Sequence, residues 1–340
     1  MLLGKSFGSD NHSGVHPEVM QALMKSNEGH QAAYGADSYS QGLNKLFSHS
    51  FEAEAQVFLV FTGTAANTLA IRSSCKSFEA VVTSNIAHLN QDECGAPEFI
   101  SGNKILSFPH KNGKISPATI EQLRIQPQDP HRVLPRLVSI TQATEVGTVY
   151  SIDEIQAIAA AAHQRNLLVH MDGARLANAA AFLGCGLADL SSKAGIDILS
   201  FGGTKNGLLC AEAVVIFKPE LAAHFAYYRK QSMQLASKMR FLSCQFEAYL
   251  LDQLWRRNAL AANNMAQYLR QRLSVVEDSH FPYPTEANEV FVKLPEDLSK
   301  HMQERASAIV WDAATGLLRF VTSFDSHHED IDRLFAGIDL

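Results

Sequence analysis

The chain has 340 residues, of which 46% are hydrophobic and 19% are charged, and its formal net charge is −6. This composition provides for a large hydrophobic core and excludes a wholly disordered protein, and the length suits a large domain with a smaller one. Because the charge is negative and no basic residues cluster, a nucleic-acid-binding protein is not expected.

Neither the start of the chain nor its cysteines indicate secretion. The first residues, MLLGKSFGSDNHSG, contain no apolar run of signal-peptide length, and no segment approaches ~18 uninterrupted apolar residues, so we expect no membrane span. The five cysteines form no C-x-x-C pair, which favours reduced thiols over disulfides or a zinc site. We therefore expect a cytoplasmic protein without a bound metal.

From about residue 55 to residue 220, short apolar runs alternate with helical patterns. Most runs are unbroken, as expected for a sheet covered on both faces, and their order predicts an α/β domain with a mainly parallel sheet. The predicted strands are 56–61, 80–84, 137–141, 167–171, 196–201 and 213–217.

Two helix starts between these strands carry clear signals. Ser151 and Glu154 form a capping box for a helix that we expect to run to about Arg165. Ser116 followed by Pro117 predicts another helix, with proline at its first position.

The pattern changes after about residue 220. Long helical stretches are predicted at 219–234 and 239–273, followed by short strands at 289–294 and 317–323 and a helix near 299–307. This order indicates a separate, smaller α+β unit.

Polar residues stand at the ends of several predicted strands, where open α/β sheets bind their ligands. The four clusters are Thr62-Gly63-Thr64, His88, Asp172-Gly173-Ala174-Arg175 and Gly202-Gly203-Thr204-Lys205. We expect them to share one edge of the sheet.

Lys205 is the candidate for covalent chemistry. Lysine condenses reversibly with aldehydes, and partial burial or a neighbouring cation favours the deprotonated amine that this reaction needs. Lys205 follows the strand at 196–201 and is flanked by Gly203 and Gly207, although an ordinary loop lysine would fit the same motif. The order Gly-Gly-Thr-Lys does not fit a P-loop.

Asp172 closes the apolar run 167–171. A carboxylate there could hold the pyridine nitrogen of pyridoxal 5′-phosphate (PLP) protonated, or it could be the N-cap of the next helix. Thr62, Gly63 and Thr64 join a strand to a helix, so hydroxyl groups, an open backbone and a helix N-terminus could together bind phosphate.

His88 and Arg319 are weaker candidates. His88 could stack on a cofactor ring, although an isolated histidine is more often an ordinary core or surface residue. Arg319 could bind a substrate carboxylate in a two-pronged pair, or it could lie on the solvent face of an edge strand. Phosphate site, stacking ring, ring-nitrogen carboxylate and lysine nevertheless occur in the chain order that a PLP enzyme requires.

These motifs resemble those of the fold-type I PLP enzymes (aspartate aminotransferase-like) and, within them, the low-specificity L-threonine aldolases and phenylserine aldolases. The resemblance runs nearly end to end, and its most specific motifs surround Asp172 and Lys205. The matching segments are Ser9-Asp10-Asn11, Tyr34-Gly35-Ala36-Asp37, Thr62-Gly63-Thr64-Ala65-Ala66-Asn67, His88 with Glu93, Met171–Leu176, Ser200–Gly207 and Arg319–Ser323.

For the cofactor, the resemblance implies a Schiff base at Lys205, a ring-nitrogen contact from Asp172 and stacking by His88. It also implies phosphate contacts from Gly63 and Thr64. In this fold the cofactor belongs to a large domain, which we expect at 14–245, with a small domain formed by 246–340 together with 1–13.

For the substrate, the resemblance implies that Ser9, Arg175 and Arg319 bind the carboxylate of an amino acid. It further implies a homodimer or homotetramer with active sites between subunits, in which a basic residue reaches the phosphate from the partner. Arg229 and Lys230 are the candidates for that contact.

Two positions depart from the family pattern. Many members carry histidine where this chain has Glu145, and that histidine is a proposed base for the substrate hydroxyl, so the base is left open here. The stretch Tyr34–Gln41 also differs from the commoner Tyr-Gly-Glu-Asp-Pro-Thr form.

We therefore expect a PLP-dependent lyase that cleaves an L-β-hydroxy-α-amino acid, such as L-threonine, L-allo-threonine or phenylserine, to glycine and an aldehyde. A β-eliminating lyase, or another enzyme of this fold acting on an amino acid, is the alternative, and glycine release would distinguish them. A catalytically silent protein of the same fold would be colourless and would stay so with added PLP. A dehydrogenase is disfavoured because no G-x-G-x-x-G follows a strand.

Overall fold

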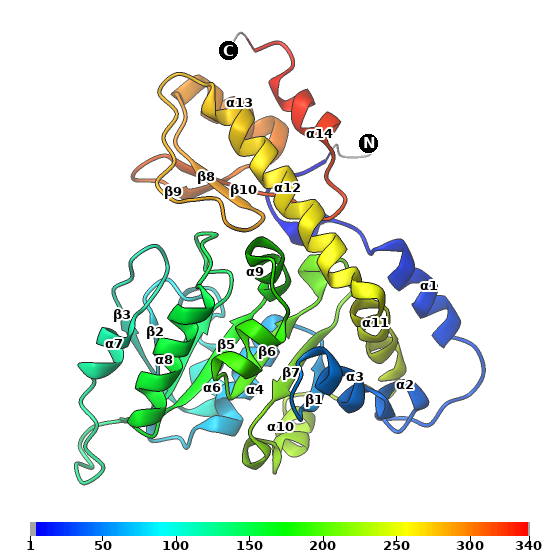
Figure 1. Ribbon diagram of the computed structural model, residues 1–340, viewed down its shortest axis with the longest axis vertical. Helices are drawn as coiled ribbons and strands as arrows, with labels where there is room; N and C mark the ends of the chain where they lie inside the picture. The colour runs from blue at the N-terminus through cyan, green and yellow to red at the C-terminus, as the bar shows by residue number, and fades with distance from the viewer. Residues whose placement is uncertain (1–4, 339–340) are drawn as a thin grey trace.

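The computed structural model describes residues 5–338, in which a seven-stranded sheet and a three-stranded sheet are joined by the long helix α12 (Leu254–Ser274) (Figure 1). The order of the large sheet is β1-β7-β6-β5-β4-β2-β3. Its strands are β1 (Gln56–Val60), β2 (Glu79–Ser84), β3 (Lys104–Phe108), β4 (Leu134–Thr141), β5 (Leu168–Gly173), β6 (Ile198–Gly202) and β7 (Glu212–Ile216).

The predicted mainly parallel sheet is confirmed. Strands β3, β2, β4, β5 and β6 are parallel neighbours, whereas β7 is antiparallel to both β6 and β1. Because β7 reverses the direction twice, β1 runs the same way as the parallel strands. The sequence did not predict β3, which lies at the edge of the sheet and exposes Lys104 and Ser107.

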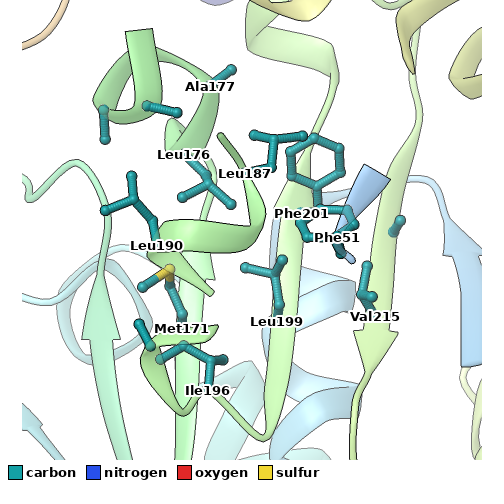
Figure 2. Packing of buried hydrophobic residues seen from close by; sticks show 14 of the residues in the cluster. Phe51, Met171, Leu176, Ala177, Leu187, Leu190, Ile196, Leu199, Phe201 and Val215 are labelled. Carbon is teal, nitrogen blue, oxygen red and sulfur yellow. The ribbon is translucent and has the colours of Figure 1, made fainter. Parts of the chain in front are cut away.

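The strands read as unbroken apolar runs because helices cover both faces of the sheet. One face packs against α4 (Gly63–Ser74) and α10 (Phe225–Gln231) and takes side chains such as Ile198. Leu199 and Phe201 point to the other face, where Figure 2 shows them packed with Met171, Leu176 and Leu187. The helices on that second face include α3 (Leu43–Ser50), α8 (Ile152–Gln164), α9 (Leu176–Leu183) and α11 (Arg240–Leu250).

Local signals place several of these helices. The predicted capping box is confirmed, since the Glu154 N–H donates to Ser151 Oγ at 3.1 Å and α8 begins at the next residue after that serine. The predicted start at Ser116 and Pro117 is also confirmed, but the helix is short. The remaining helices of this part are α1 (Pro17–Ser26), α2 (Ser38–Gln41), α5 (His88–Gln91), α6 (Ala96–Ser101) and α7 (Pro117–Glu121).

Short 3₁₀ turns connect many of these elements. They are η1 (Asp10–His12), η2 (Ala188–Leu190), η3 (Ser192–Ala194), η4 (Thr204–Asn206), η5 (Pro219–Ala222) and η6 (Leu251–Gln253).

The prediction of two continuous long helices after residue 220 was wrong. The first is divided into η5 and α10, and the second is divided into α11 and α12 by η6. At the second break, Asp252 and Gln253 adopt left-handed backbone angles, with φ of 50° and 53°, which a continuous α-helix does not permit. Neither residue is glycine or proline, so the sequence carried no usual helix-breaking signal.

The small sheet is antiparallel and has the order β8-β10-β9. The start of the chain joins it, because the Phe7 carbonyl accepts from the Val321 N–H at 2.7 Å and the Phe7 ring is buried in the second core with Leu318 and Phe320. Its elements are β8 (Glu289–Val292), α13 (Glu296–Ala306), β9 (Ile309–Asp312), β10 (Leu317–Val321), α14 (His328–Asp332) and η7 (Arg333–Phe335).

Helix α12 belongs to both cores. Leu254 and Ala259, near its start, are buried in the core of the large sheet, whereas Leu269 and Leu273 are buried in that of the small sheet. In Figure 1 this helix runs from the large sheet up to the small one, which lies over α9.

Three further observations concern the described part of the chain. No helix in residues 5–338 has both the length and the apolar character of a membrane span. The cysteines of this part are free thiols. No three or more of its His, Cys, Asp or Glu side chains come together as ligands for a metal ion.

Candidate active site

The polar clusters predicted at strand ends do lie at one edge of the large sheet. His88, Asp172 and Lys205 follow or close β2, β5 and β6, which are parallel. Because β1 runs in the same direction, the segment Thr62-Gly63-Thr64 that follows it reaches the same edge. Both Asp172 and Lys205 act electrostatically on His88, which places the three side chains in one neighbourhood.

Asp172 is buried and held in place by two hydrogen bonds. Its Oδ2 accepts from the side-chain amide of Asn67 at 2.8 Å, and its Oδ1 accepts from the Ala174 N–H at 3.0 Å. Helix α9 begins at Leu176 with Arg175 as its N-cap residue, so the alternative that Asp172 caps this helix is wrong.

A chain of hydrogen bonds connects His88 to Asp172. The same Asn67 amide nitrogen donates to Glu93 Oε1 at 2.8 Å, and this oxygen lies 2.9 Å from His88 Nδ1. The hydrogen bond with Glu93 raises the pKa of His88, and the Asp172 charge raises it further against the effect of burial. The His88 side chain remains 41% exposed, so part of the ring is accessible to a ligand.

Lys205 lies in η4, directly after β6, and is half-buried. The turn is fixed by the Gly203 N–H, which donates to Glu212 Oε2 at 3.0 Å, and by Asn206, whose amide donates to the Tyr249 hydroxyl at 2.7 Å. Gly207 closes the turn with φ of 106°, and a Cβ there would lie 2.7 Å from the amide nitrogen of Asn258. The sequence after Lys205 therefore needs glycine for a backbone reason.

The N-terminus of α4 forms an open polar end of the site. Thr62 is its N-cap and accepts from the Ala65 N–H at 3.1 Å. Gly63 and Thr64 are half-buried, and no atom lies within 4 Å of the position where a Cβ on Gly63 would be. Free N–H groups beside open space suit an anion such as phosphate.

Arg229 and Lys230 contact residues of their own chain. Arg229 Nη1 donates to the Leu59 carbonyl of β1 at 3.4 Å, and its guanidinium lies 5.4 Å from the Phe58 ring centre. Lys230 is exposed, with its Nζ 5.2 Å from the Tyr34 ring centre. Their reach to the phosphate of a partner subunit stays a prediction.

Arg175 is bound tightly by a carboxylate of the N-terminal segment. Its Nε and Nη2 donate to the two carboxylate oxygens of Asp10 at 2.8 and 3.0 Å, and its Nη1 lies 3.6 Å from Glu289 Oε1. Burial alone would lower the pKa of Arg175, but the charges of Asp10 and Glu289 raise it overall. Arg175 therefore stays charged in the buried site.

Arg319 lies on the central strand of the small sheet, so the alternative of an edge strand is wrong. It is half-buried, its Nη2 donates to the Gly8 carbonyl at 3.4 Å, and its guanidinium lies 5.0 Å from the Trp311 ring centre. In sequence, Ser9 lies between Gly8, which contacts Arg319, and Asp10, which binds Arg175. The Ser9 Oγ accepts a hydrogen bond from the Asn11 backbone N–H at 3.2 Å. The three predicted carboxylate-binding residues thus come from three separate parts of the chain and meet around η1.

Glu145, the position that departs from the family pattern, is buried beside His88. Its Oε1 accepts from the Thr141 hydroxyl at 2.7 Å and from the His88 N–H at 2.9 Å, while its Oε2 has no hydrogen-bond partner within residues 5–338. Burial raises the pKa of Glu145 to about 7. Its carboxyl group therefore fixes the start of α5 and can change protonation near neutral pH.

Sequence reasoning assigned no role to four residues of this site. Asp10, Asn67 and Glu93 stood inside the quoted motifs but were given no contact, and Glu289 was not singled out. A charged residue at the start of the apolar run Glu289–Val292 is the one signal that could have drawn attention to Glu289.

The site has the donor and acceptor groups that PLP needs. The open N-terminus of α4 at Gly63 suits a phosphate, and the buried Asp172 carboxylate suits a protonated ring nitrogen. His88 supplies a partly exposed ring, and Lys205 supplies a half-buried amine directly after β6. The residues at this edge of the sheet therefore fit the cofactor.

Known proteins resemble this chain over nearly its whole length. The family model described as beta-eliminating lyase matches residues 6–297. A protein of Pseudomonas sp. (strain NCIMB 10558) named low specificity L-threonine aldolase is 44% identical over 98% of this chain and 97% of its own length.

Solved structures show the same resemblance. A threonine aldolase from Leishmania major superimposes with a TM-score of 0.89 at 28% identity, covering 97% of this chain and 98% of that one. Aspartate aminotransferase from Rhizobium meliloti superimposes with a TM-score of 0.71 at 12% identity over 98% and 89% of the two chains, which confirms the predicted fold class. With the fold of the type I PLP enzymes and the matches to its sequence, the chain belongs to the beta-eliminating lyase family.

Proposed function

We propose that the protein is a PLP-dependent aldehyde-lyase that cleaves L-threonine, L-allo-threonine or related L-β-hydroxy-α-amino acids, such as phenylserine, to glycine and an aldehyde. One observation carries the proposal: Lys205 and Asp172 lie at the same sheet edge in a chain that is 44% identical to a low specificity L-threonine aldolase. The hydrogen-bonded chain from Asp172 through Asn67 and Glu93 to His88 supports it.

When bound, PLP supplies an electron sink for the negative charge that develops at the substrate Cα. Lys205 would hold it covalently, and Gly63 and Thr64 would hold its phosphate. The negative charge of Asp172 would keep the ring nitrogen protonated. The hydrogen bond from Asn67 holds the Asp172 carboxylate in position. His88 would lie against the ring.

The substrate would be oriented through its carboxylate. Arg319 would supply the main pair, because the guanidinium of Arg175 is already bound by both oxygens of Asp10. Ser9 is the N-cap of η1 and follows Gly8, whose carbonyl accepts from Arg319, so its hydroxyl would add a donor. Holding the carboxylate fixes which bond at Cα stands perpendicular to the cofactor ring, and so decides which bond breaks.

The hydroxyl proton of the substrate must leave as the Cα–Cβ bond breaks. We assign its transfer to His88 Nε2, since Nδ1 is engaged by Glu93, and the hydrogen bond with Glu93 raises the pKa of His88, which makes the ring a stronger proton acceptor. Glu145 would position His88, because its Oε1 accepts a hydrogen bond from the backbone N–H of His88 and its Oε2 is buried.

The assembly and location of the protein extend this proposal. We propose a cytoplasmic homodimer or homotetramer with active sites between subunits, in which Arg229 or Lys230 reaches the phosphate of the partner. We also propose two domains, 14–245 and 246–340 with 1–13, of which residues 1–4 and 339–340 lie outside the described part. The first part of the second domain would then include the start of α12, which packs in the core of the large sheet.

The decisive experiment is a product assay on purified protein loaded with PLP. L-Threonine, L-allo-threonine and phenylserine are supplied in turn, and glycine, aldehyde, ammonia and keto acid are measured, with Lys205→Ala as the control. Glycine with an equal amount of aldehyde supports the proposal. Ammonia with a keto acid would instead establish β-elimination, and no product from any substrate would overturn both.

A further inference from the structure

Glu289 is a buried carboxylate that no hydrogen bond satisfies. It is 1% exposed, and neither of its carboxylate oxygens has a hydrogen-bond partner within residues 5–338. Its nearest ion-pair contact is the 3.6 Å separation between Oε1 and Arg175 Nη1, which is too long for a hydrogen bond. Burying a charge without such bonds is costly, so this arrangement calls for a functional explanation.

The charged groups that face Glu289 come from four elements. They are Asp10 of η1, Arg175 at the start of α9, Lys205 of η4 and Arg319 of β10. Glu289 pairs with Val321 across the small sheet, and Arg319 lies two residues before Val321 on the same face. Glu289 and Arg319 are therefore diagonal neighbours.

The two carboxylates of this cluster are held very differently. Asp10 forms two hydrogen bonds with Arg175 and accepts a third from the Asn288 amide at 3.1 Å. Burial would raise the pKa of Asp10, but the charge of Arg175 and these hydrogen bonds lower it overall, so Asp10 stays ionised. Glu289 has no comparable bonds, and burial raises its pKa although Arg175 and Arg319 act in the opposite direction.

Arg319 also has a donor in reserve. Its Nε is buried and has no hydrogen-bond partner within residues 5–338, and its Nη2 makes only the 3.4 Å contact with the Gly8 carbonyl. A ligand carboxylate could use these donors. The unused donor on Arg319 and the unused acceptors on Glu289 therefore lie in the same buried cluster.

With Glu289 ionised, the charge of the cluster is balanced before the substrate arrives. The charges of Asp10 and Glu289 then offset those of Arg175 and Arg319, leaving aside Lys205, which would hold the cofactor. A substrate carboxylate adds a third negative charge to two guanidinium groups, and a buried excess charge favours binding of a proton. Asp10 cannot accept that proton without losing its bonds to Arg175.

We propose that Glu289 takes up one proton from solvent when the substrate carboxylate binds Arg319, and so acts as an exchangeable counter-ion that sets carboxylate affinity. The proton adds to a Glu289 oxygen, and the charge of the cluster stays balanced. Glu289 thereby offsets the charge of Arg319 in the free enzyme and loses its own charge when the substrate carboxylate arrives. This inference depends on the carboxylate site of the proposed function.

The proposal is tested by calorimetry on the PLP-loaded enzyme with 3-hydroxybutanoate, which is threonine without its amine and cannot react with the cofactor. Titrations in two buffers of different ionisation enthalpy give the number of protons taken up on binding. Wild type should take up as much as one proton per site, and Glu289→Gln should take up none. The control is Glu286→Gln, which changes a nearby carboxylate that accepts from the Val149 N–H instead, and it should behave as wild type.

Affinity gives a second readout that a damaged fold would not produce. Because binding is coupled to proton uptake, wild-type affinity for 3-hydroxybutanoate should fall as pH rises. If binding raises the proton affinity of Glu289 by about tenfold, the total loss of ligand affinity should also be about tenfold. Glu289→Gln should bind 3-hydroxybutanoate more tightly than wild type above neutral pH and show little pH dependence. If that variant does not fold, the infrared difference spectrum of wild type should still gain a protonated carboxyl band on binding.

The outcomes separate this inference from the proposed function. Binding to wild type without proton uptake, unchanged uptake in Glu289→Gln, or weaker binding by folded Glu289→Gln at every pH would overturn the role of Glu289 alone. If wild type does not bind 3-hydroxybutanoate, or if Arg319→Leu binds it equally well, the carboxylate site itself is wrong and the inference fails with it.

Discussion

The side-chain amide of Asn67 donates a 2.8 Å hydrogen bond to the carboxylate of Asp172. Asn67 lies on α4, the helix whose N-terminus forms the open polar end of the site, whereas Asp172 closes β5. One side chain thus connects the proposed phosphate end of the site to the carboxylate that would contact the cofactor ring.

Asp172→Asn should lower kcat by orders of magnitude while KM changes little. The substitution keeps the shape of the side chain but removes the charge that stabilises a protonated ring nitrogen, and this support is needed most in the transition state. Steady-state kinetics of glycine release would measure the effect. Turnover within a few-fold of wild type would contradict the role of Asp172.

Lys205→Ala should abolish the covalent attachment of PLP. Borohydride reduction followed by mass spectrometry should find the cofactor on Lys205 in wild type and on no residue of the variant. Lys218→Ala is a matched control, because Lys218 lies beyond β7 and pairs with Asp197 on another part of the molecule. Reduced cofactor attached elsewhere in the Lys205 variant would show that another lysine is the true site.

Arg319→Lys should reduce kcat/KM by roughly a hundredfold, since lysine cannot form the two-pronged pair with a carboxylate and such a pair contributes a few kcal/mol. Arg305→Lys is the control, because Arg305 is exposed and donates to the Arg333 and Ala336 carbonyls of the same small sheet region. Wild-type kcat/KM in Arg319→Lys would exclude Arg319 from substrate binding.

Both L-threonine and L-allo-threonine should be cleaved, and D-threonine should be refused. At Cα the substrate is held by the cofactor, by the carboxylate contacts around Arg319 and by the bond that must break, so only one hand fits. At Cβ, Glu145 is buried and engaged with His88 and Thr141, which leaves few groups to fix the hydroxyl.

We expect a ratio of roughly tenfold between the two L isomers, which corresponds to ~1.4 kcal/mol. Steady-state kinetics on all three isomers would test this. A thousandfold ratio between the L isomers would reveal an unrecognised contact at Cβ, and comparable cleavage of D-threonine would contradict the carboxylate clamp.

Glu145→Gln should stabilise the protein at pH 8 but not near pH 4.5. Burial raises the pKa of Glu145 to about 7, above the value in an unfolded chain. As pH rises between those two values, the unfolded state loses its proton first, so the folded state is disfavoured by roughly 3–4 kcal/mol once pH is well above 7. The glutamine has no proton to lose and avoids this effect.

Urea denaturation of both proteins at the two pH values would measure the difference. Glu154→Gln is a suitable comparison, because Glu154 is a more exposed carboxylate that caps α8 and pairs with Lys114. Equal or lower stability of Glu145→Gln at pH 8 would contradict a raised pKa of Glu145 in the folded protein.

The sequence predicted the parts of this molecule that depend on local patterns. Apolar runs located six strands, and the polar residues after them, including Asp172 and Lys205, marked the correct edge of the sheet. The break between α11 and α12 was missed because Asp252 and Gln253 adopt left-handed angles although neither is glycine or proline.

Contacts between distant parts of the chain could not be predicted in this way. Asn67 and Asp172 are 105 residues apart, and whether their side chains meet depends on the positions of α4 and β5 in the finished sheet. The environment of Glu289 is set by residues from η1, α9 and β10, so its burial among arginines has no local signature.

The antiparallel strand β7 also determines when the site can form during folding. Within residues 5–338, β1 pairs only with β7, and Gln56 lies opposite Ile216. During synthesis, β1 must therefore wait for about 160 further residues before it gains a neighbour, and closing so long a loop slows folding. Because α4 follows β1, the phosphate end is positioned only after the strands that carry Asp172 and Lys205 exist, so a nascent chain can gain its cofactor only late in folding.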